Sequence, residues 1–148
     1  MKLFIASDHA GYELKTKLAD FLLAAGYEVE DCGPAKLNPG DDYPDYITPC
    51  ARKVADTNDS MGILVGLTGE GEAMAANRVR GARAAEYYGG PQEILKLSRQ
   101  HNNANILSLG ARFLSFDEAK SAVVLWLGTH FEHDERHMRR IQKMDHGS

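Results

Sequence analysis

The stretch 3-LFIASDHAGYELKTKLADFLLAAGYEVEDC-32 contains the pattern that decides the fold. Its first five residues form an apolar run without alternation, which is typical of a strand buried on both faces. A polar turn, Asp8 to Gly11, follows this run. Apolar residues then recur at helical spacing from Tyr12 to Ala25, and Gly26 provides a C-terminal cap. The segment 27–32 is extended again, so the stretch predicts one βαβ unit of a parallel sheet.

The same alternation continues along the rest of the chain. Further strands are predicted at 62–66, 82–87 and 104–110, and helices at 47–55, 91–101, 116–127 and 135–143, with another helix starting within 72–78. Strands that alternate with helices indicate a parallel sheet that is covered on both faces. The sequence therefore predicts a single domain over residues 1–148, an α/β fold with a three-layer α/β/α sandwich around a five-stranded parallel sheet, of the flavodoxin or Rossmann type.

Length and composition exclude several classes of protein. A chain of 148 residues fits one domain and can bury roughly two-thirds of its unfolded surface. The net charge of −4 gives no reason to expect nucleic acid as a partner. No apolar run approaches the roughly 20 residues that span a bilayer, so no membrane association is expected. Cys32 and Cys50 form no C-x-x-C pattern and the N-terminus soon turns polar, which predicts a cytoplasmic protein with reduced thiols.

The most unusual motif is 65-VGLTGEGEAMAANR-78, which follows directly from a predicted buried strand. Its glycines can aim backbone N–H groups at a phosphate or a developing oxyanion, although glycines after a strand also serve tight turns. The motif is neither a nucleotide P-loop nor a dinucleotide G-x-G-x-x-G. It contains instead the hydroxyl donor Thr68 and the acid Glu72, which could accept a proton.

Two other segments carry polar side chains near the ends of predicted elements. Asp8 and His9 stand at the carboxyl end of the first strand, where α/β folds keep their ligand sites. An aspartate that caps the next helix and a solvated histidine would explain the same residues. His101 and Asn102, in 98-SRQHNNAN-105, stand at the end of a helix. A histidine there can simply interact favourably with the helix dipole.

The segment 130-HFEHDERHMRR-140 places His133 and His137 four residues apart, a spacing that zinc sites use. Neighbouring arginines and the lack of a suitably spaced third ligand argue against a metal, and no metal or cofactor is expected. Arg136 and Arg140 are also four apart and could clamp an anion such as phosphate, although a solvated basic face is the commoner role for such a run. Arg112 is a further candidate for the same anion or for a structural ion pair.

Taken together, SDHAGYELK, DDYPDY (41–46), TGEGEAMAANR, SRQHNNAN and RHMRR (136–140) resemble the ribose-5-phosphate isomerase B family, and more distantly the galactose-6-phosphate isomerase subunits. The resemblance runs over nearly the whole chain with its blocks in order. It implies metal-free interconversion of an aldose phosphate and its ketose phosphate in a flavodoxin-like fold. It also implies a homodimer, or a tetramer, whose sites lie between subunits, with a C-terminal helix at about 133–145 reaching the partner.

One departure from the family pattern affects the catalytic base. Many members carry a catalytic cysteine two residues before the loop threonine, and this chain has Gly66 there. A second branch uses a glutamate in a Gly-x-Gly-Glu pattern, which by this match makes Glu72 the base. A base in this reaction removes the C2 proton of an open aldose, and the resulting cis-enediolate needs stabilisation by donors such as Thr68 and the loop N–H groups. Of Glu70, only the backbone N–H is expected to matter.

The resemblance assigns the remaining site residues position by position. His101 corresponds to the acid that opens the sugar ring. The other residues expected to bind substrate are Asp8, which also takes part in catalysis, His9, Gly69, Gly71 and Asn102, with Arg112, Arg136 and Arg140 for the phosphate. Tyr43 receives no role. Two alternatives stay open: an isomerase of six-carbon sugar phosphates such as allose or galactose 6-phosphate, and a catalytically silent sugar-phosphate-binding module.

Overall fold

The computed structural model describes residues 1–147, in which five strands and six helices alternate. The strands are β1 (Lys2–Ser7), β2 (Glu28–Asp31), β3 (Ser60–Gly66), β4 (Ala84–Tyr87) and β5 (Ile106–Gly110). The helices are α1 (Tyr12–Ala24), α2 (Pro44–Asp56), α3 (Glu70–Asn77), α4 (Glu93–Gln100), α5 (Phe116–Leu127) and α6 (Glu135–His146).

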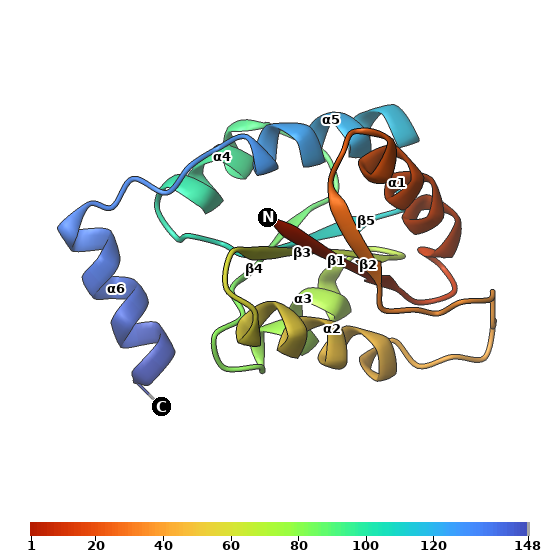
Figure 1. The fold of residues 1–148 in the computed structure, drawn as a ribbon, viewed down its shortest axis with the longest axis horizontal. Coiled ribbons are helices and arrows are strands. Elements are labelled where there is room, and N and C mark those ends of the chain that lie inside the picture. Colours follow the sequence, from red (N-terminus) through yellow and green to blue (C-terminus); the bar gives the residue numbers. More distant parts are fainter. Residues whose placement is uncertain (148) are drawn as a thin grey trace.

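All five strands run parallel, in the order β2-β1-β3-β5-β4. Helices α1, α4 and α5 cover one face of the sheet, and α2 and α3 cover the other (Figure 1). Each face has its own apolar core, because successive side chains of the buried strands point to opposite sides. Leu3 and Ile5 enter the α1 side, for example, and Phe4 and Ala6 the α2 side. The predicted three-layer fold with a five-stranded parallel sheet is confirmed.

The structure differs from the sequence prediction in the bounds of several elements, and it adds the strand order, which was not predicted. Helix α2 begins at Pro44 and not at residue 47, because proline is well suited to the first turn of a helix, where its missing N–H costs nothing. The strand order also differs from the flavodoxin order 2-1-3-4-5 in its last two members. Strand β5 is buried beside β3, and the short strand β4 forms the edge.

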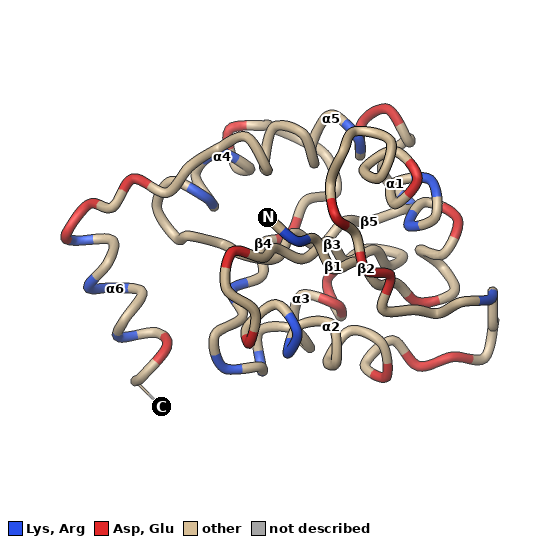
Figure 2. The backbone as a smooth tube through the Cα atoms, in the orientation of Figure 1, with Lys and Arg blue, Asp and Glu red and all other residues tan. Residues whose placement is uncertain are grey.

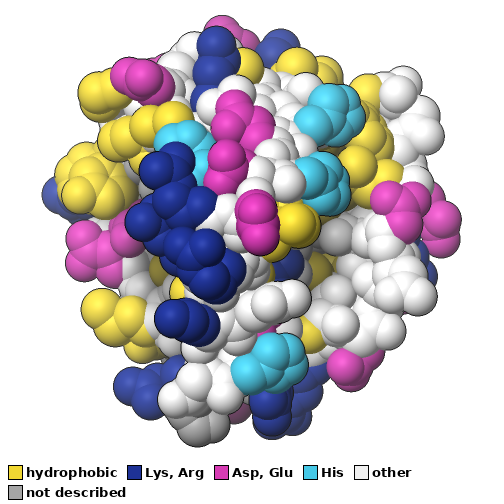
Figure 3. All heavy atoms as spheres, turned by 90° about the vertical axis from the view of Figure 1, so that its left-hand side faces the viewer, with side chains coloured by type: hydrophobic (Ala, Val, Ile, Leu, Met, Phe, Trp, Pro, Cys, Tyr) yellow, Lys and Arg dark blue, Asp and Glu magenta, His cyan; other side chains and the backbone are white. Residues whose placement is uncertain are grey.

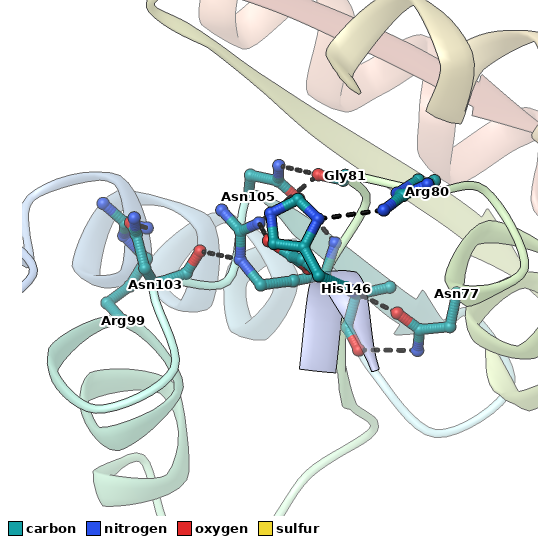
Figure 4. A network of polar contacts seen from close by, with 10 residues as sticks. Asn77, Arg80, Gly81, Arg99, Asn103, Asn105 and His146 are labelled. Atoms are coloured by element: carbon teal, nitrogen blue, oxygen red, sulfur yellow. Dashed lines mark hydrogen bonds and ion pairs between the residues drawn. The ribbon is translucent and has the colours of Figure 1, made fainter. Parts of the chain in front are cut away.

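Helix α6 lies to one side of the three layers (Figure 1). Its first turns are anchored by His137, which is buried and stacks on His101 with ring centroids 4.4 Å apart. Its last turn is anchored by Asp145, whose carboxylate accepts a hydrogen bond from Arg83 at 3.2 Å. His146 lies 2.9 Å from Arg80 in the same polar network (Figure 4). The helix is thus held at its two ends through polar and aromatic contacts.

In the network of Figure 4, side-chain amides support the backbone next to α6. Asn105 donates to the Gly81 carbonyl at 2.8 Å, and Asn77 bonds both backbone groups of Ala84. Arg99 donates to Asn103 at 3.0 Å. These bonds fix the start of β4 and the turn that precedes β5.

Among the helices that the structure describes, none is long and apolar enough to cross a membrane.

Candidate active site

The carboxyl ends of β1 and β3 bring two of the predicted motifs together. Ser7 is paired with Val65 across the sheet, so Asp8 and Gly66 leave neighbouring strands at the same level. The Asp8 carboxylate accepts a hydrogen bond from the backbone N–H of Gly11 at 3.1 Å and thereby shapes the turn before α1. On the other strand, the glycine loop 67–69 leads directly into α3. Asp8 and the loop therefore line one edge of the sheet, as the sequence predicted.

The glycine loop is held in a conformation that aims the amino end of α3 at this edge. Gly69 has a φ of +85°, which favours glycine, and a Cβ there would lie 3.0 Å from the Leu109 backbone. The Ser108 hydroxyl donates to the Gly69 carbonyl at 2.6 Å. Glu70 N–H donates to the Thr68 hydroxyl at 3.2 Å. The N–H of Glu70 is therefore already bonded, whereas the N–H groups that follow it in the first turn of α3 have no partner within the helix and could bind an anion.

Glu72 occupies the space that a side chain on Gly66 would fill. An ideal Cβ built on Gly66 would lie 2.1 Å from the carboxyl carbon of Glu72 and 2.1 to 2.2 Å from its two oxygens. The carboxylate therefore lies directly against the end of β3. A larger residue at Gly66 would displace the Glu72 carboxylate from this position, which gives a physical reason for the departure seen in the sequence.

The environment of Glu72 suits a proton acceptor. The residue is only 4% exposed, and this burial raises the pKa of its carboxyl group above the ordinary glutamate value. Its own backbone N–H opposes the rise, whereas the charge of Asp8 and a side-chain hydrogen bond with Asp8 add to it. A carboxylate with a raised pKa is a stronger base when it is ionised.

A second carboxylate, which the sequence reasoning missed, points toward α3 from β4. Glu86 lies between Ala85, whose side chain contacts the core on the α1 side, and Tyr87, which is buried there, so Glu86 faces the α3 side. Its Oε1 atom is buried and accepts no hydrogen bond from residues 1–147. Burial, together with the charges of Glu70 and Glu72, raises the pKa of Glu86 to about 6. Only the pairing of β4 with β5, which places Glu86 opposite Ser108, could have indicated that Glu86 lies near α3.

We expect Glu86→Gln to stabilise the protein at pH 8 but not at pH 4.5. The raised pKa means that the folded protein holds this proton to a higher pH than the unfolded chain, so the stability cost develops between about pH 4.5 and 6 and is fully present above it. After allowance for partial solvent exposure, the gain is about 1 kcal/mol, or roughly 2 to 4 °C in Tm. Thermal unfolding of Glu86→Gln and of the exposed control Glu93→Gln checks this. Equal Tm changes at both pH values would contradict it.

His9 has a partner that the sequence did not indicate. Its Nδ1 lies 2.7 Å from Oδ1 of Asp41, in the loop between β2 and α2. This hydrogen bond is the largest cause that raises the pKa of His9, the charges of Asp8 and Asp41 add to it, and burial opposes it. The same loop brings Tyr43 against Gly71, where a Cβ would lie 2.8 Å from the ring. Both contacts cross long sequence separations, which local patterns cannot show.

The remaining predicted residues form a second cluster. His101 and Asn102 follow α4, and with His137 and Arg140 they line a cavity of about 310 Å³ against α6. His101 and Asn102 precede β5, so this cluster lies at the amino end of the strand, whereas Thr68 and Glu72 lie at the carboxyl end of the sheet. The five residues of β5 span roughly 16 Å. One chain therefore does not bring His101 to Glu72.

The predicted arginines also divide between the two clusters. The Arg112 backbone N–H donates to the Leu67 carbonyl at 3.0 Å, so Arg112 follows β5 beside the glycine loop. Arg136 and Arg140 are exposed on α6, where Lys and Arg side chains form a continuous band (Figure 3). Acidic residues, in contrast, occupy the loop before α2 (Figure 2). The basic band and the acidic loop thus lie on different parts of the chain.

Among residues 1–147, one group of side chains could ligate a metal ion: His101, Glu132 and His137, whose ligand atoms lie within 4.8 Å of one another. It is not the His133 and His137 pair considered from the sequence. The two imidazole rings are stacked at an interplanar angle of 21°, and an ion would have to lie in the plane of both rings. The observed ring positions therefore do not suit shared ligation, because ring planes with centroids 4.4 Å apart and inclined by only 21° intersect far beyond the reach of a metal–nitrogen bond.

Comparison with known proteins agrees with the predicted resemblance. The sequence model of the Ribose/Galactose Isomerase family matches residues 3–144. Ribose-5-phosphate isomerase B from Mycobacterium tuberculosis is 39% identical over 142 residues, which are 95% of this chain and 86% of that protein.

Two solved structures share the fold along nearly their whole length. Ribose-5-phosphate isomerase B from Mycoplasma genitalium, determined with bound ribulose-5-phosphate, has a TM-score of 0.90 and 41% identity over 97% of this chain and 93% of that one. The Thermotoga maritima ribose 5-phosphate isomerase has a TM-score of 0.90 and 43% identity, with 97% of each chain covered. The chain therefore belongs to the ribose/galactose isomerase family.

Proposed function

We infer that this protein is an aldose–ketose isomerase that interconverts ribose 5-phosphate and ribulose 5-phosphate. One observation carries the inference most directly: the buried Glu72 carboxylate fills the space beside Gly66, next to Asp8 and to the amino end of α3. The relatives named for this activity, one of them with ribulose-5-phosphate bound, support the pentose phosphate as substrate.

The proposed reaction proceeds through a cis-enediolate. Glu72 removes the C2 proton of the open-chain aldose and returns it to C1, and the same carboxylate can do both because the two carbons are adjacent. The hydroxyl proton of O2 passes to O1, so that the aldehyde becomes an alcohol and the C2 alcohol becomes a ketone. The negative charge that develops on the sugar oxygens is stabilised by backbone N–H groups at the start of α3 and by the Thr68 hydroxyl. Gly69, Glu70 and Gly71 contribute backbone groups to this anion-binding turn. Asp8 helps to raise the pKa of the Glu72 carboxyl group through its charge and its hydrogen bond.

The complete site needs a second copy of the chain. We propose a homodimer in which the partner supplies His101, the acid that opens the ring, together with Asn102, Arg136 and Arg140. Support comes from the roughly 16 Å of β5 that separates the two clusters, and from α6, which stands apart from the layers and carries its arginines into solvent. The basic band would then meet both the substrate phosphate and the acidic site of the other subunit.

Mixing two inactive variants tests the shared site. We expect Glu72→Gln and His101→Ala each to be inactive, and a refolded 1:1 mixture to recover about a quarter of the wild-type rate, because half of the dimers are mixed and each has one intact site. The isomerase rate of the mixture measures this. A mixture that stays as inactive as its components would place both residues in one subunit's site.

The proposed chemistry uses no metal or cofactor, because a carboxylate and hydrogen-bond donors suffice for an enediolate reaction. We also propose a cytoplasmic location, which is consistent with the two free thiols of Cys32 and Cys50. The alternatives are an isomerase of six-carbon sugar phosphates and a silent binding module. Glu72 argues against the silent module, since a buried carboxylate beside a second one, Asp8, would repel an anion and has no use in simple anion binding.

A direct assay distinguishes these three functions. We expect ketose formation from ribose 5-phosphate, with a much lower kcat/KM for allose 6-phosphate and galactose 6-phosphate. Turnover mainly of a hexose phosphate would move the substrate assignment to six carbons. Binding of both substrate classes without turnover would support the silent module.

A further inference from the structure

The loop between β2 and α2 delivers a buried carboxylate to His9. The Asp41 side chain is only 2% exposed, whereas the imidazole of His9 is 41% exposed. Oδ1 of Asp41 lies 2.7 Å from Nδ1 of His9 and also accepts the His9 backbone N–H at 3.2 Å. One carboxylate oxygen therefore contacts both the ring and the backbone of a residue 32 positions away.

The loop that carries Asp41 is fixed at several points. Lys15 is almost fully buried and donates to the Pro34 carbonyl at 2.7 Å, while its ammonium also pairs with Asp31. The Asp41 backbone N–H donates to the Asn38 carbonyl at 3.1 Å. The loop then ends at Tyr43, where α2 starts. Because both ends of the loop are held, the position of the Asp41 carboxylate is set before any ligand arrives.

The hydrogen bonding of Asp41 differs from that of a purely structural carboxylate. Its second oxygen, Oδ2, is buried and accepts no hydrogen bond from the residues that the structure describes. Buried polar atoms in folded proteins nearly always have a partner, so an anchor for the loop alone would be expected to use both oxygens. Asp41 instead directs its hydrogen bonds to His9 alone.

This arrangement determines how His9 faces the site. With Nδ1 bound to Asp41, the ring carries its proton on that atom or on both, and Nε2 is the ring atom left for a ligand. His9 is the next residue after Asp8, whose carboxyl group interacts with that of Glu72. The charged groups that act on the imidazole are Asp41 from the loop and Asp8 from its own segment, and both favour the imidazolium.

Resting on the proposed function, we propose that Asp41 is a positioning residue for the isomerase reaction. It holds the His9 imidazole in one orientation and favours its protonated form, so that Nε2–H is presented to an oxygen of the sugar phosphate. A fixed cation beside Asp8 and Glu72 attracts and orients an oxygen-rich anionic substrate in an otherwise acidic site. Asp41 itself does not touch the substrate.

The test compares Asp41→Asn with the matched control Asp42→Asn, which changes the adjacent exposed carboxylate. The pKa of His9 is measured by NMR titration of ¹³C-labelled histidine, with His9→Gln to identify the signal. We expect Asp41→Asn to lower that pKa and Asp42→Asn to leave it unchanged. In Asp41→Asn, kcat/KM for ribose 5-phosphate should fall at least about tenfold, and the alkaline limb of its pH profile should move to lower pH.

Two outcomes would overturn the proposal. One is an unchanged His9 pKa in Asp41→Asn. The other is an unmoved alkaline limb with a lower Tm, which would leave Asp41 a loop anchor only. A wild type without isomerase activity would refute the proposed function, whereas the His9 titration would still decide whether Asp41 controls this imidazole.

Discussion

Replacement of Glu72 by glutamine is expected to lower kcat for ribose 5-phosphate by about a thousandfold, within the range that removal of a general base produces. The amide keeps the size and shape of the side chain but cannot accept the C2 proton. The fold should be retained, because glutamine also removes a charge that burial disfavours at this 4% exposed position. Steady-state rates together with a Tm measurement separate loss of the base from loss of the structure.

Glu70→Gln is the matched control for this substitution. Glu70 stands two residues earlier on the same helical turn, but it is exposed and its backbone N–H bonds Thr68. We expect it to keep most of the wild-type rate. Equal losses of rate in the two variants would mean that the rate depends on negative charge at the start of α3, and not on Glu72 as a base.

The second large effect is expected from Gly66→Ala. The new methyl group would lie 2.1 Å from the Glu72 carboxyl group, so the carboxylate must move away. A displacement of about 1 Å in a reacting group can cost a hundredfold in rate, and we expect a loss of that size. Stability should change little, because the group that moves is the end of a flexible side chain. Rate and Tm measured on the same preparation reveal this separation.

Two comparisons make the Gly66 prediction specific. Gly62→Ala, on the same strand, would place its methyl group 2.9 Å from Val54 and 3.2 Å from Ile106 in the core, so it should lower Tm but leave kcat nearly unchanged. In the Glu72→Gln background, Gly66→Ala should cause almost no further loss of rate, because the two substitutions remove the same function. Fully additive losses would contradict the proposed steric relation.

The sequence predicted the layers of the fold because the buried strands are short apolar runs. LFIAS and GILVG carry no alternation, and the structure buries both as β1 and β3 at the centre of the sheet. The order of β4 and β5 could not be predicted in the same way. Their pairing depends on which strand can be buried beside β3, a property of the assembled sheet and not of either segment.

For the site, the residues that the sequence could indicate are those next to each other in the chain. The acid within the glycine loop led to Glu72, and the strand end led to Asp8. Asp41 and Glu86 were not predicted because each reaches the site from a distant segment. Asp41 lies 32 positions from His9 in the sequence, and Glu86 is placed by the pairing of β4 with β5. The assignment of His101 to the same site as Glu72 depended wholly on the family resemblance. Within one chain, His101 and Glu72 remain apart.

Solvent isotope exchange tests the enediolate chemistry and its base most directly. Ribose 5-phosphate is incubated in D₂O with the wild type or with Glu72→Gln, and deuterium at C2 of the recovered aldose is measured by NMR. We predict that the wild type introduces deuterium at C2 over many turnovers, since Glu72 exchanges its proton with solvent, and that Glu72→Gln introduces almost none. Turnover by the wild type without deuterium uptake, or undiminished uptake in Glu72→Gln, would contradict Glu72 as the base of an enediolate reaction.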